Sequence, residues 1–423
     1  MIGKMFGLLR ILKDDILLGV AEAKAHTTKS KQKGISVTRL ESLDVFRSLM
    51  MFLMIFVNDI PGLKNIPDWL LHAASDENRL GLADTVFPGF LFIMGMAVPY
   101  AVEIRRQREE PLWQILLHIM LRTLALLVMG VFIVNHDTIG KCLISQPWFG
   151  IGMVTAFFLV WNDYSKLKGY WSYILRVLGI VVLFWLAYEY KGIGGAKFSP
   201  QWWGILGLIG WSYLTCAVVV LFTRFNLLLA IVAAGVTIAL CVLPDKGIIK
   251  QLNIHHLDFL FPGGGVHAAF AIIGMMTGVI VYHFNEKANF CKTLLPILVG
   301  LVVAALAGAY WAQHHWIISK INATPTWLFL CCSIFFALFI VIYWLVDVAG
   351  KKNWFKIIAP AGTLTLTCYM IPYLWYSIQT LTGWAYPKVL NSGWPGLTRS
   401  VIFSLLCIGI AWGLSQIKIR LKI

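Results

Sequence analysis

Charged side chains are scarce in this chain of 423 residues. Asp, Glu, Lys and Arg together make up 13% of it, whereas hydrophobic residues make up 59%. Soluble domains carry roughly 25% charged residues. The mean hydropathy of +0.76 points in the same direction. This composition excludes an ordinary soluble domain and predicts a polytopic membrane protein.

Other features are missing as well. The eight cysteines include no Cys-x-x-Cys pair, so neither a disulfide framework nor a zinc site is expected. Charges interrupt the apolar runs of residues 1–23, which argues against a cleaved signal peptide. Residues 1–38 are expected to form a cytoplasmic basic tail with an interfacial helix. Residues 39–423 are expected to form one transmembrane domain, because no connection is long enough to hold a soluble one.

Long apolar segments define the expected fold, which is an all-α bundle of about twelve transmembrane helices. Their approximate bounds are Leu43–Ile60, Thr85–Ile104, Trp113–Val134, Leu143–Trp161, Ser172–Tyr190, Gly204–Phe222, Leu227–Leu243, Val266–Phe284, Thr293–Trp311, Trp327–Val346, Ile357–Ile378 and Val401–Ile417. The fourth is the weakest, because Gln146 and Pro147 interrupt it. If the fourth and fifth segments only re-enter the membrane, ten helices span it. Either number leaves both termini on the same side.

Acidic residues are the minority among the charges. The chain has 35 Lys and Arg against 20 Asp and Glu, which gives a formal net charge of +15. Such an excess can indicate nucleic-acid binding. Here, however, basic runs at 105–108, 351–356 and 418–422 fall at ends of expected helices that share one side. The positive-inside bias therefore predicts that both termini are cytoplasmic, with a lipid bilayer rather than nucleic acid as the partner.

The loop between the first two segments holds the most informative chemistry. Asn58 closes the first segment, Asp84 opens the second, and His72 lies between them. Both helix ends belong to one membrane face, so an imidazole, a carboxylate and an amide meet there. His72 could exchange protons, Asp84 could orient its ring, and Asn58 could donate to an oxyanion. The alternative is a solvated loop histidine beside an aspartate that caps a helix.

Basic residues at the other end of the helices form a second candidate site. Asp44 and Arg47, three residues apart, can form a structural ion pair on one helix face. Arginine also binds phosphate through two parallel hydrogen bonds, so Arg39 and Arg47 are candidates for binding a phosphorylated ligand. Arg122 follows His118 by one helical turn and should face the bundle interior, where it binds either protein groups or a ligand.

The stretch from Arg39 to Gly95 resembles the transmembrane acyltransferase family of heparan-α-glucosaminide N-acetyltransferase and its bacterial relatives. The shared pattern consists of Asp44 and Arg47, Val57-Asn58, His72-Ala73, the run Ala83–Pro88, Phe90, Phe92 and Ile93–Gly95. A weaker likeness continues downstream, where Ile318–Trp327 keeps Lys320 and Thr324 of a family segment. The chain departs from the family in lacking a glycine run after Asn58 and a Gln-Arg pair near Gly207.

The resemblance implies an acetyl-CoA-dependent N-acetyltransferase. It implies transfer of an acetyl group from cytoplasmic acetyl-CoA to an amino sugar of the glucosamine type on the opposite face. The residues implied are His72, Asp84 and Asn58 for catalysis, Arg39, Arg47, Arg122 and Lys320 for cofactor binding, and none for a metal. Direct transfer and transfer through an acetyl-histidine are both open.

The expected partners are acetyl-CoA, an amino sugar or glycan acceptor and the bilayer, with a homodimer and a monomer both open. The expected location is a bacterial inner (cytoplasmic) membrane. The runner-up function is an amino-sugar or N-acetylglucosamine permease, because charge within the membrane also suits a secondary carrier. The lack of a detectable two-half repeat argues mildly against it.

Overall fold

A computed structural model describes residues 40–140, 143–165, 167, 170–243, 264–285 and 289–423. The basic tail expected over residues 1–38, and Arg39, lie outside the described residues. Within the described ranges the secondary structure is helical, and β-pairing is limited to three isolated bridges. The prediction of an all-α membrane bundle is confirmed.

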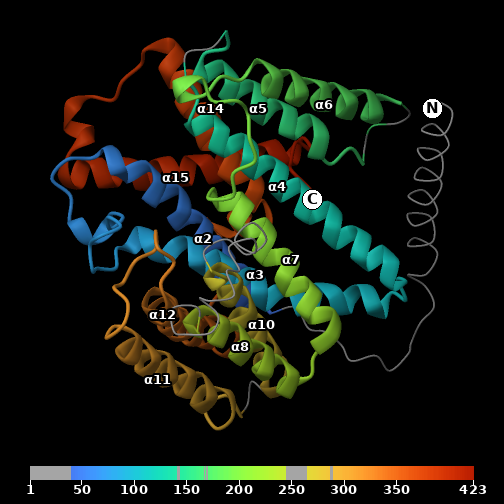
Figure 1. Cartoon of the computed structure of the whole chain (residues 1–423), viewed down its shortest axis with the longest axis vertical. Helices are drawn as coiled ribbons and strands as arrows, with labels where there is room; N and C mark the ends of the chain where they lie inside the picture. The colour runs from blue at the N-terminus through green and yellow to red at the C-terminus, as the bar shows by residue number, and fades with distance from the viewer. Residues whose placement is uncertain (1–39, 141–142, 166, 168–169, 244–263, 286–288) are drawn as a thin grey trace. The chain divides into compact units, whose positions relative to one another are not determined.

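Eleven of the expected transmembrane segments each correspond to one helix, whereas Ile357–Ile378 is broken at Leu364 into the short helix α13 (Ala359–Thr363) and α14 (Figure 1). The helices are α2 (Glu41–Asp59), α3 (Leu82–Gln107), α4 (Leu112–Asp137), α5 (Gln146–Trp161), α6 (Trp171–Glu189), α7 (Ile205–Thr223), α8 (Leu227–Val242), α10 (Val266–Phe284), α11 (Leu294–Ala312), α12 (Pro325–Tyr343), α14 (Thr365–Thr382) and α15 (Gly393–Gln416). Among the described residues, eight helices are long and apolar enough to cross a membrane. The remaining four are the shorter apolar helices α5 and α8, together with α2 and α14, which contain more polar residues.

The central pair of helices, α3 and α10, packs backbone against backbone. A Cβ atom added at Gly95 would lie 1.8 Å from the carbonyl oxygen of Ala271, and one at Gly274 would lie 2.0 Å from that of Phe92. Small residues allow such close approach between membrane helices, where dispersion contacts replace the hydrophobic effect as the driving force. The most apolar part of α10 is 89% buried, so this helix lies in the interior of the bundle.

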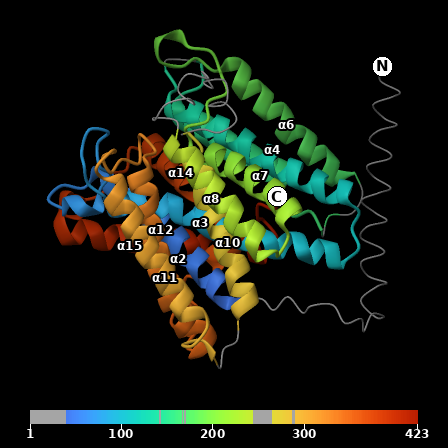
Figure 2. The same cartoon turned by 60° about the horizontal axis from the view of Figure 1, so that its bottom comes forward.

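Apolar side chains also cover the outside of the bundle. The most apolar part of α6 is only 17% buried, and its exposed side chains include Val177, Phe184 and Trp185. Two views show α5 and α6 on one flank and α11 with α12 on the other, with α2, α3 and α10 between them (Figures 1 and 2). An apolar surface of this extent is what lipid contact requires.

Candidate active site

His72 lies in the segment that joins α2 to α3. This segment contains two single turns of 3-10 helix, η2 (Ile60–Gly62) and η3 (Asp68–Leu70), and His72 follows the second. Its side chain is 39% exposed. Pro61 lies in the first turn and Pro67 directly precedes the second, positions at which proline is tolerated because the start of a helix needs no backbone donor there.

Asp84 fixes the orientation of the His72 ring. Its Oδ1 lies 2.7 Å from Nδ1 of His72, and its side chain is 3% exposed. A buried carboxylate accepts hydrogen bonds, so Nδ1 carries the proton and Nε2 holds the lone pair. The geometry is that of an imidazole held by a carboxylate, with Nε2 on the side of the ring that faces away from Asp84.

The second oxygen of Asp84 is occupied by the backbone. Oδ2 accepts hydrogen bonds from the amides of Ala73 (3.0 Å) and Gly81 (3.2 Å). Asp84 therefore caps α3 and orients His72 at once. The sequence offered these two roles of Asp84 as alternatives, and the structure shows that one carboxylate fills both. The indole of Trp327 donates to the Asp84 carbonyl over 3.1 Å, which ties α12 to the same point.

Gly81 allows this close fit. A Cβ atom added there would lie 1.8 Å from the carbonyl oxygen of Leu71 and 3.3 Å from Oδ2 of Asp84. Its φ of −86° is ordinary, so the constraint is space rather than backbone strain. No local sequence pattern identifies Gly81, because its neighbours in the chain do not indicate which distant backbone will pass beside it.

Lys320 completes the group from a distant part of the chain. Its Nζ lies 3.4 Å from Nδ1 of His72. Because the Nδ1 proton is already directed at Asp84, this approach is an electrostatic contact rather than a second hydrogen bond. Burial lowers the pKa of Lys320, although the nearby Asp84 carboxylate acts in the opposite direction.

Two loops meet around this group. Asn78 accepts a hydrogen bond from the amide of Ile318 (2.8 Å), and Asn322 donates to the carbonyl of Ser75 (2.9 Å). Arg79 donates to the carbonyl oxygens of Asp68 (2.8 Å) and His72 (3.1 Å) and so braces the first loop internally. The position of Lys320 beside His72 is thus fixed by several independent contacts.

Asn58 stands apart from these contacts. It is exposed in the last turn of α2, and no hydrogen bond joins it to His72 or Asp84 among the described residues. The neighbouring Asp59 is 5% exposed and accepts hydrogen bonds from Tyr376 (2.6 Å), Arg399 (2.9 Å) and Ser400 (2.6 Å). These bonds fix the end of α2 against α14 and α15. The role of Asn58 at an oxyanion stays a prediction.

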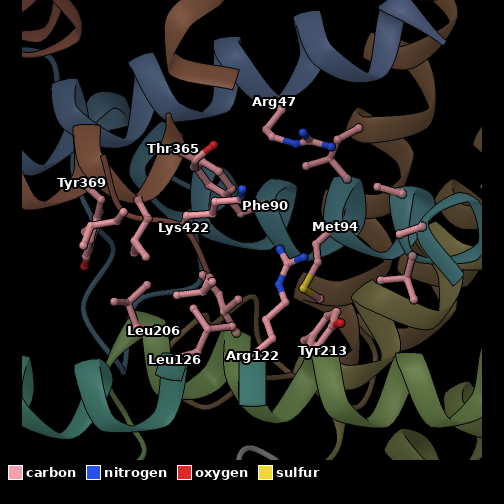
Figure 3. Close-up of a pocket in the computed structure, with 18 of the residues that line it drawn as sticks. Arg47, Phe90, Met94, Arg122, Leu126, Leu206, Tyr213, Thr365, Tyr369 and Lys422 are labelled. Atoms are coloured by element: carbon pink, nitrogen blue, oxygen red, sulfur yellow. The ribbon is translucent and has the colours of Figure 1, made fainter. Parts of the chain in front are cut away.

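A cavity of about 500 Å³ lies nearer the other end of α2 and α3. Its walls come from α2, α3, α4, α7, α13, the start of α14 and residues 421–423, and they include Arg47, Arg105, Arg122 and Lys422. Figure 3 shows Arg47 and Arg122 reaching into this space from opposite walls. Lys320 does not line it, so the structure separates Lys320 from Arg47 and Arg122. Arg39 lies outside the described residues.

The two arginines are held in different ways. Arg47 lies 3.7 Å from the Asp44 carboxylate and donates to the carbonyl of Gly362 over 3.4 Å. Arg122 lies over the Tyr213 ring, with its Cζ 4.8 Å from the centroid. Its Nε is buried and has no hydrogen-bond partner among the described residues. A buried guanidinium nitrogen of this kind is suited to an anionic ligand.

The length of α3 relates the two sites. The 21 residues from Asp84 to Arg105 correspond to about 32 Å at 1.5 Å per residue, which is the thickness of a bilayer core. The cavity reaches Phe90, six residues or about 9 Å from Asp84. A long, thin ligand anchored by the cations could therefore extend most of the way to His72.

Comparison with known proteins supports the resemblance found in the opening stretch. Residues 39–247 match a family described as a domain of unknown function, DUF5009. Human heparan-alpha-glucosaminide N-acetyltransferase is 38% identical over 110 residues, which cover 26% of this chain and 15% of that protein. The mouse protein of the same name is 37% identical over 113 residues, covering 27% and 16%. The family resemblance is confirmed, over a small share of those relatives.

Proposed function

Because this chain is related to the heparan-α-glucosaminide N-acetyltransferase family, we propose that it is a membrane-embedded acyltransferase. It takes the acetyl group from acetyl-CoA in the cytoplasm and transfers it to the amine of a glucosamine-type sugar on the opposite face. The observation that carries the proposal is the His72–Asp84 pair, with Nδ1 bound over 2.7 Å and Nε2 left to act. The proposed location is a bacterial inner membrane, with both termini cytoplasmic.

The cationic cavity is the proposed site for the donor. Coenzyme A carries several phosphate charges and cannot cross a bilayer, whereas its pantetheine arm is thin and uncharged. Arg47 and Arg122 would bind the phosphates, and the arm would run along α3 past Phe90 towards His72. Separate anchoring of the charged part and the reactive thioester suits a reaction that joins substrates from two sides of a membrane.

The proposed chemistry needs one base that also acts as an acid. The acceptor nitrogen attacks the thioester carbonyl, a C–N bond forms and the C–S bond breaks. Nε2 of His72 takes the proton from the nitrogen and returns it to the departing sulfur. Asp84 stabilises the imidazolium between these steps. In the alternative mechanism, Nε2 of His72 itself accepts the acetyl group from the thioester and then passes it to the acceptor nitrogen.

Lys320 is assigned to the acyl end of the donor rather than to its phosphates. Its amine lies 3.4 Å from Nδ1 of His72, so a positive charge stands beside the proposed reacting ring and would stabilise negative charge that develops on the thioester oxygen. Asn58, at the same end of α2, is proposed as a second donor to that oxygen.

Free thiol measures the proposed reaction directly. Purified protein is incubated with acetyl-CoA and a panel of amino sugars, with His72→Ala as the control. Thiol release and an N-acetylated sugar that both depend on His72 would support the proposal. Uptake of labelled N-acetylglucosamine into proteoliposomes, with no thiol release under any condition, would favour a permease and overturn it.

A further inference from the structure

The residues after α15 fold back into the bundle. The chain turns at Lys418, whose φ is 66°, and residues 420–422 then run between the end of α5 and the start of α14. The amide of Lys422 donates to the Trp161 carbonyl over 2.8 Å, and that of Leu421 donates to the Thr367 hydroxyl over 3.0 Å. Backbone contacts on two sides therefore fix this segment, residues 418–423.

One ion pair secures the segment. Arg420 directs Nε (3.0 Å) and Nη2 at Oδ2 of Asp163, which follows α5 and is 6% exposed. The backbone adds a bond from the Asp163 amide to the Arg420 carbonyl (3.2 Å) and one from the Arg420 amide to Asn162 (2.9 Å). Burial raises the pKa of Asp163, but the hydrogen bonds from Arg420 and Ser165 outweigh it and lower the pKa to about 2. The Asp163 carboxylate therefore stays charged at any physiological pH.

The end of this segment forms part of the cavity wall, which includes Leu421, Lys422 and Ile423. Figure 3 shows the Lys422 side chain entering the same space as Arg47 and Arg122. The described side chains that line the cavity include three arginines and this lysine but no Asp or Glu. Glu110 pairs with Arg105 (2.6 Å) and Asp44 lies 3.7 Å from Arg47, so Arg122 and Lys422 supply most of the unbalanced positive charge, which is suited to an anion.

We propose that segment 418–423 is part of the donor site, with Lys422 binding a phosphate group of the acyl donor and the Asp163–Arg420 pair positioning that lysine. The inference rests on the proposed function and deepens it, because it assigns a further segment and a further cation to the binding of the donor's phosphates. Lys422 comes from a different segment than Arg47 and Arg122, so the three cations can surround a bulky, multiply charged group. Arg420 is a positioning residue, since its guanidinium is bound to Asp163.

Ligand binding by purified full-length protein tests this inference without catalysis. The dissociation constants of coenzyme A and of phosphate-free pantetheine are measured for Lys422→Gln. The matched control is Lys418→Gln, a lysine of the same segment that does not line the cavity. Loss of one charge-assisted phosphate contact should weaken coenzyme A binding about tenfold in Lys422→Gln, with pantetheine unchanged and Lys418→Gln like wild type.

Asp163→Asn tests the positioning role. Releasing Arg420 should weaken coenzyme A binding by a smaller factor and raise KM while leaving kcat near wild type, because His72 is untouched. Thermal unfolding of each variant separates loss of the contact from loss of the fold. A coenzyme A affinity of Lys422→Gln equal to that of Lys418→Gln, or an equal loss for pantetheine, would overturn the inference while the proposed function stands.

Lys422 could bind the phosphate of a lipid headgroup instead of a phosphate of coenzyme A, and the experiment distinguishes the two ligands. The measurements are repeated in nanodiscs with and without phosphatidylglycerol. If Lys422→Gln alters retention of that lipid but not coenzyme A affinity, the segment binds lipid and the donor role is overturned. Wild-type protein that binds no coenzyme A at all would remove both the inference and the proposed function.

Discussion

Nδ1 of His72 lies 2.7 Å from Oδ1 of Asp84, and the second oxygen of that carboxylate is filled by two backbone amides. The carboxylate therefore cannot turn away from the ring without leaving buried amides unpaired, which costs roughly 1–3 kcal/mol for each group. The ring is held in one tautomer and one orientation before any substrate binds. Such preorganisation is what the proposed role of His72 as a base requires.

His72→Ala should leave a folded protein that binds acetyl-CoA but turns over at least about 10²-fold more slowly, which is the low end for lost acid–base catalysis. Asp84→Asn should also reduce the rate, because a neutral amide cannot stabilise the imidazolium. The double variant should be little slower than His72→Ala alone, since residues that act as a unit are not additive. Steady-state kinetics of the three variants check this, and near-normal turnover by His72→Ala would contradict the proposed chemistry.

Much of this arrangement follows from local sequence. The helices were predictable because each lies in a long apolar run, although α5 and α8 are shorter than a full span and the run Ile357–Ile378 is broken at Leu364. The meeting of His72 and Asp84 was predictable because one short loop joins two neighbouring helices. Lys320 and Lys422 take their places through contacts between segments hundreds of residues apart, and no local pattern encodes such contacts. Gly81 matters only because the Leu71 carbonyl passes beside it.

Gly81→Ala tests whether close packing holds the pair in place. The added methyl group would meet the Leu71 carbonyl at 1.8 Å, so the loop must shift. We expect a loss of about 1–3 kcal/mol in stability, as for other overpacked sites, and slower turnover. Gly62→Ala is the matched control, because nothing lies within 4 Å of a Cβ there and Gly62 is in the same loop. Thermal unfolding and thiol release are measured for Gly81→Ala and Gly62→Ala. Equal stability and equal turnover of the two variants would show that the loop accommodates the added methyl group.

The pH dependence of turnover tests the charge on Lys320. Burial lowers the pKa of this lysine, so its amine is charged at lower pH and loses the proton earlier than an exposed lysine as the pH rises. If the cation stabilises the developing oxyanion, activity should fall on the alkaline side. Lys320→Arg stays charged there and should move that fall to higher pH, whereas Lys320→Gln should be slow at every pH. An alkaline limb unchanged in Lys320→Arg would assign the fall to another group.

The direction of transfer depends on which faces of the membrane the two ends of α3 occupy. Asp84 and Arg105 are about 32 Å apart along this helix, so they lie at opposite faces. The basic run at 105–108 predicts that its end is cytoplasmic. Asp76→Cys and Gln107→Cys report on the two ends, because both native side chains are exposed. They are made in a background with Cys142 and Cys291 replaced by serine, since Cys291 is exposed and would react.

An impermeant maleimide applied to intact cells should label Asp76→Cys at once, and Gln107→Cys only after permeabilisation. Each variant serves as the control for the other, because both carry one added thiol in the same background. The His72 group would then face the outside while the cationic cavity opens towards cytoplasmic acetyl-CoA. The reverse labelling would place His72 at the cytoplasmic face. Acetyl-CoA and the sugar would then need no passage through the bundle, and the proposed path along α3 would lose its purpose.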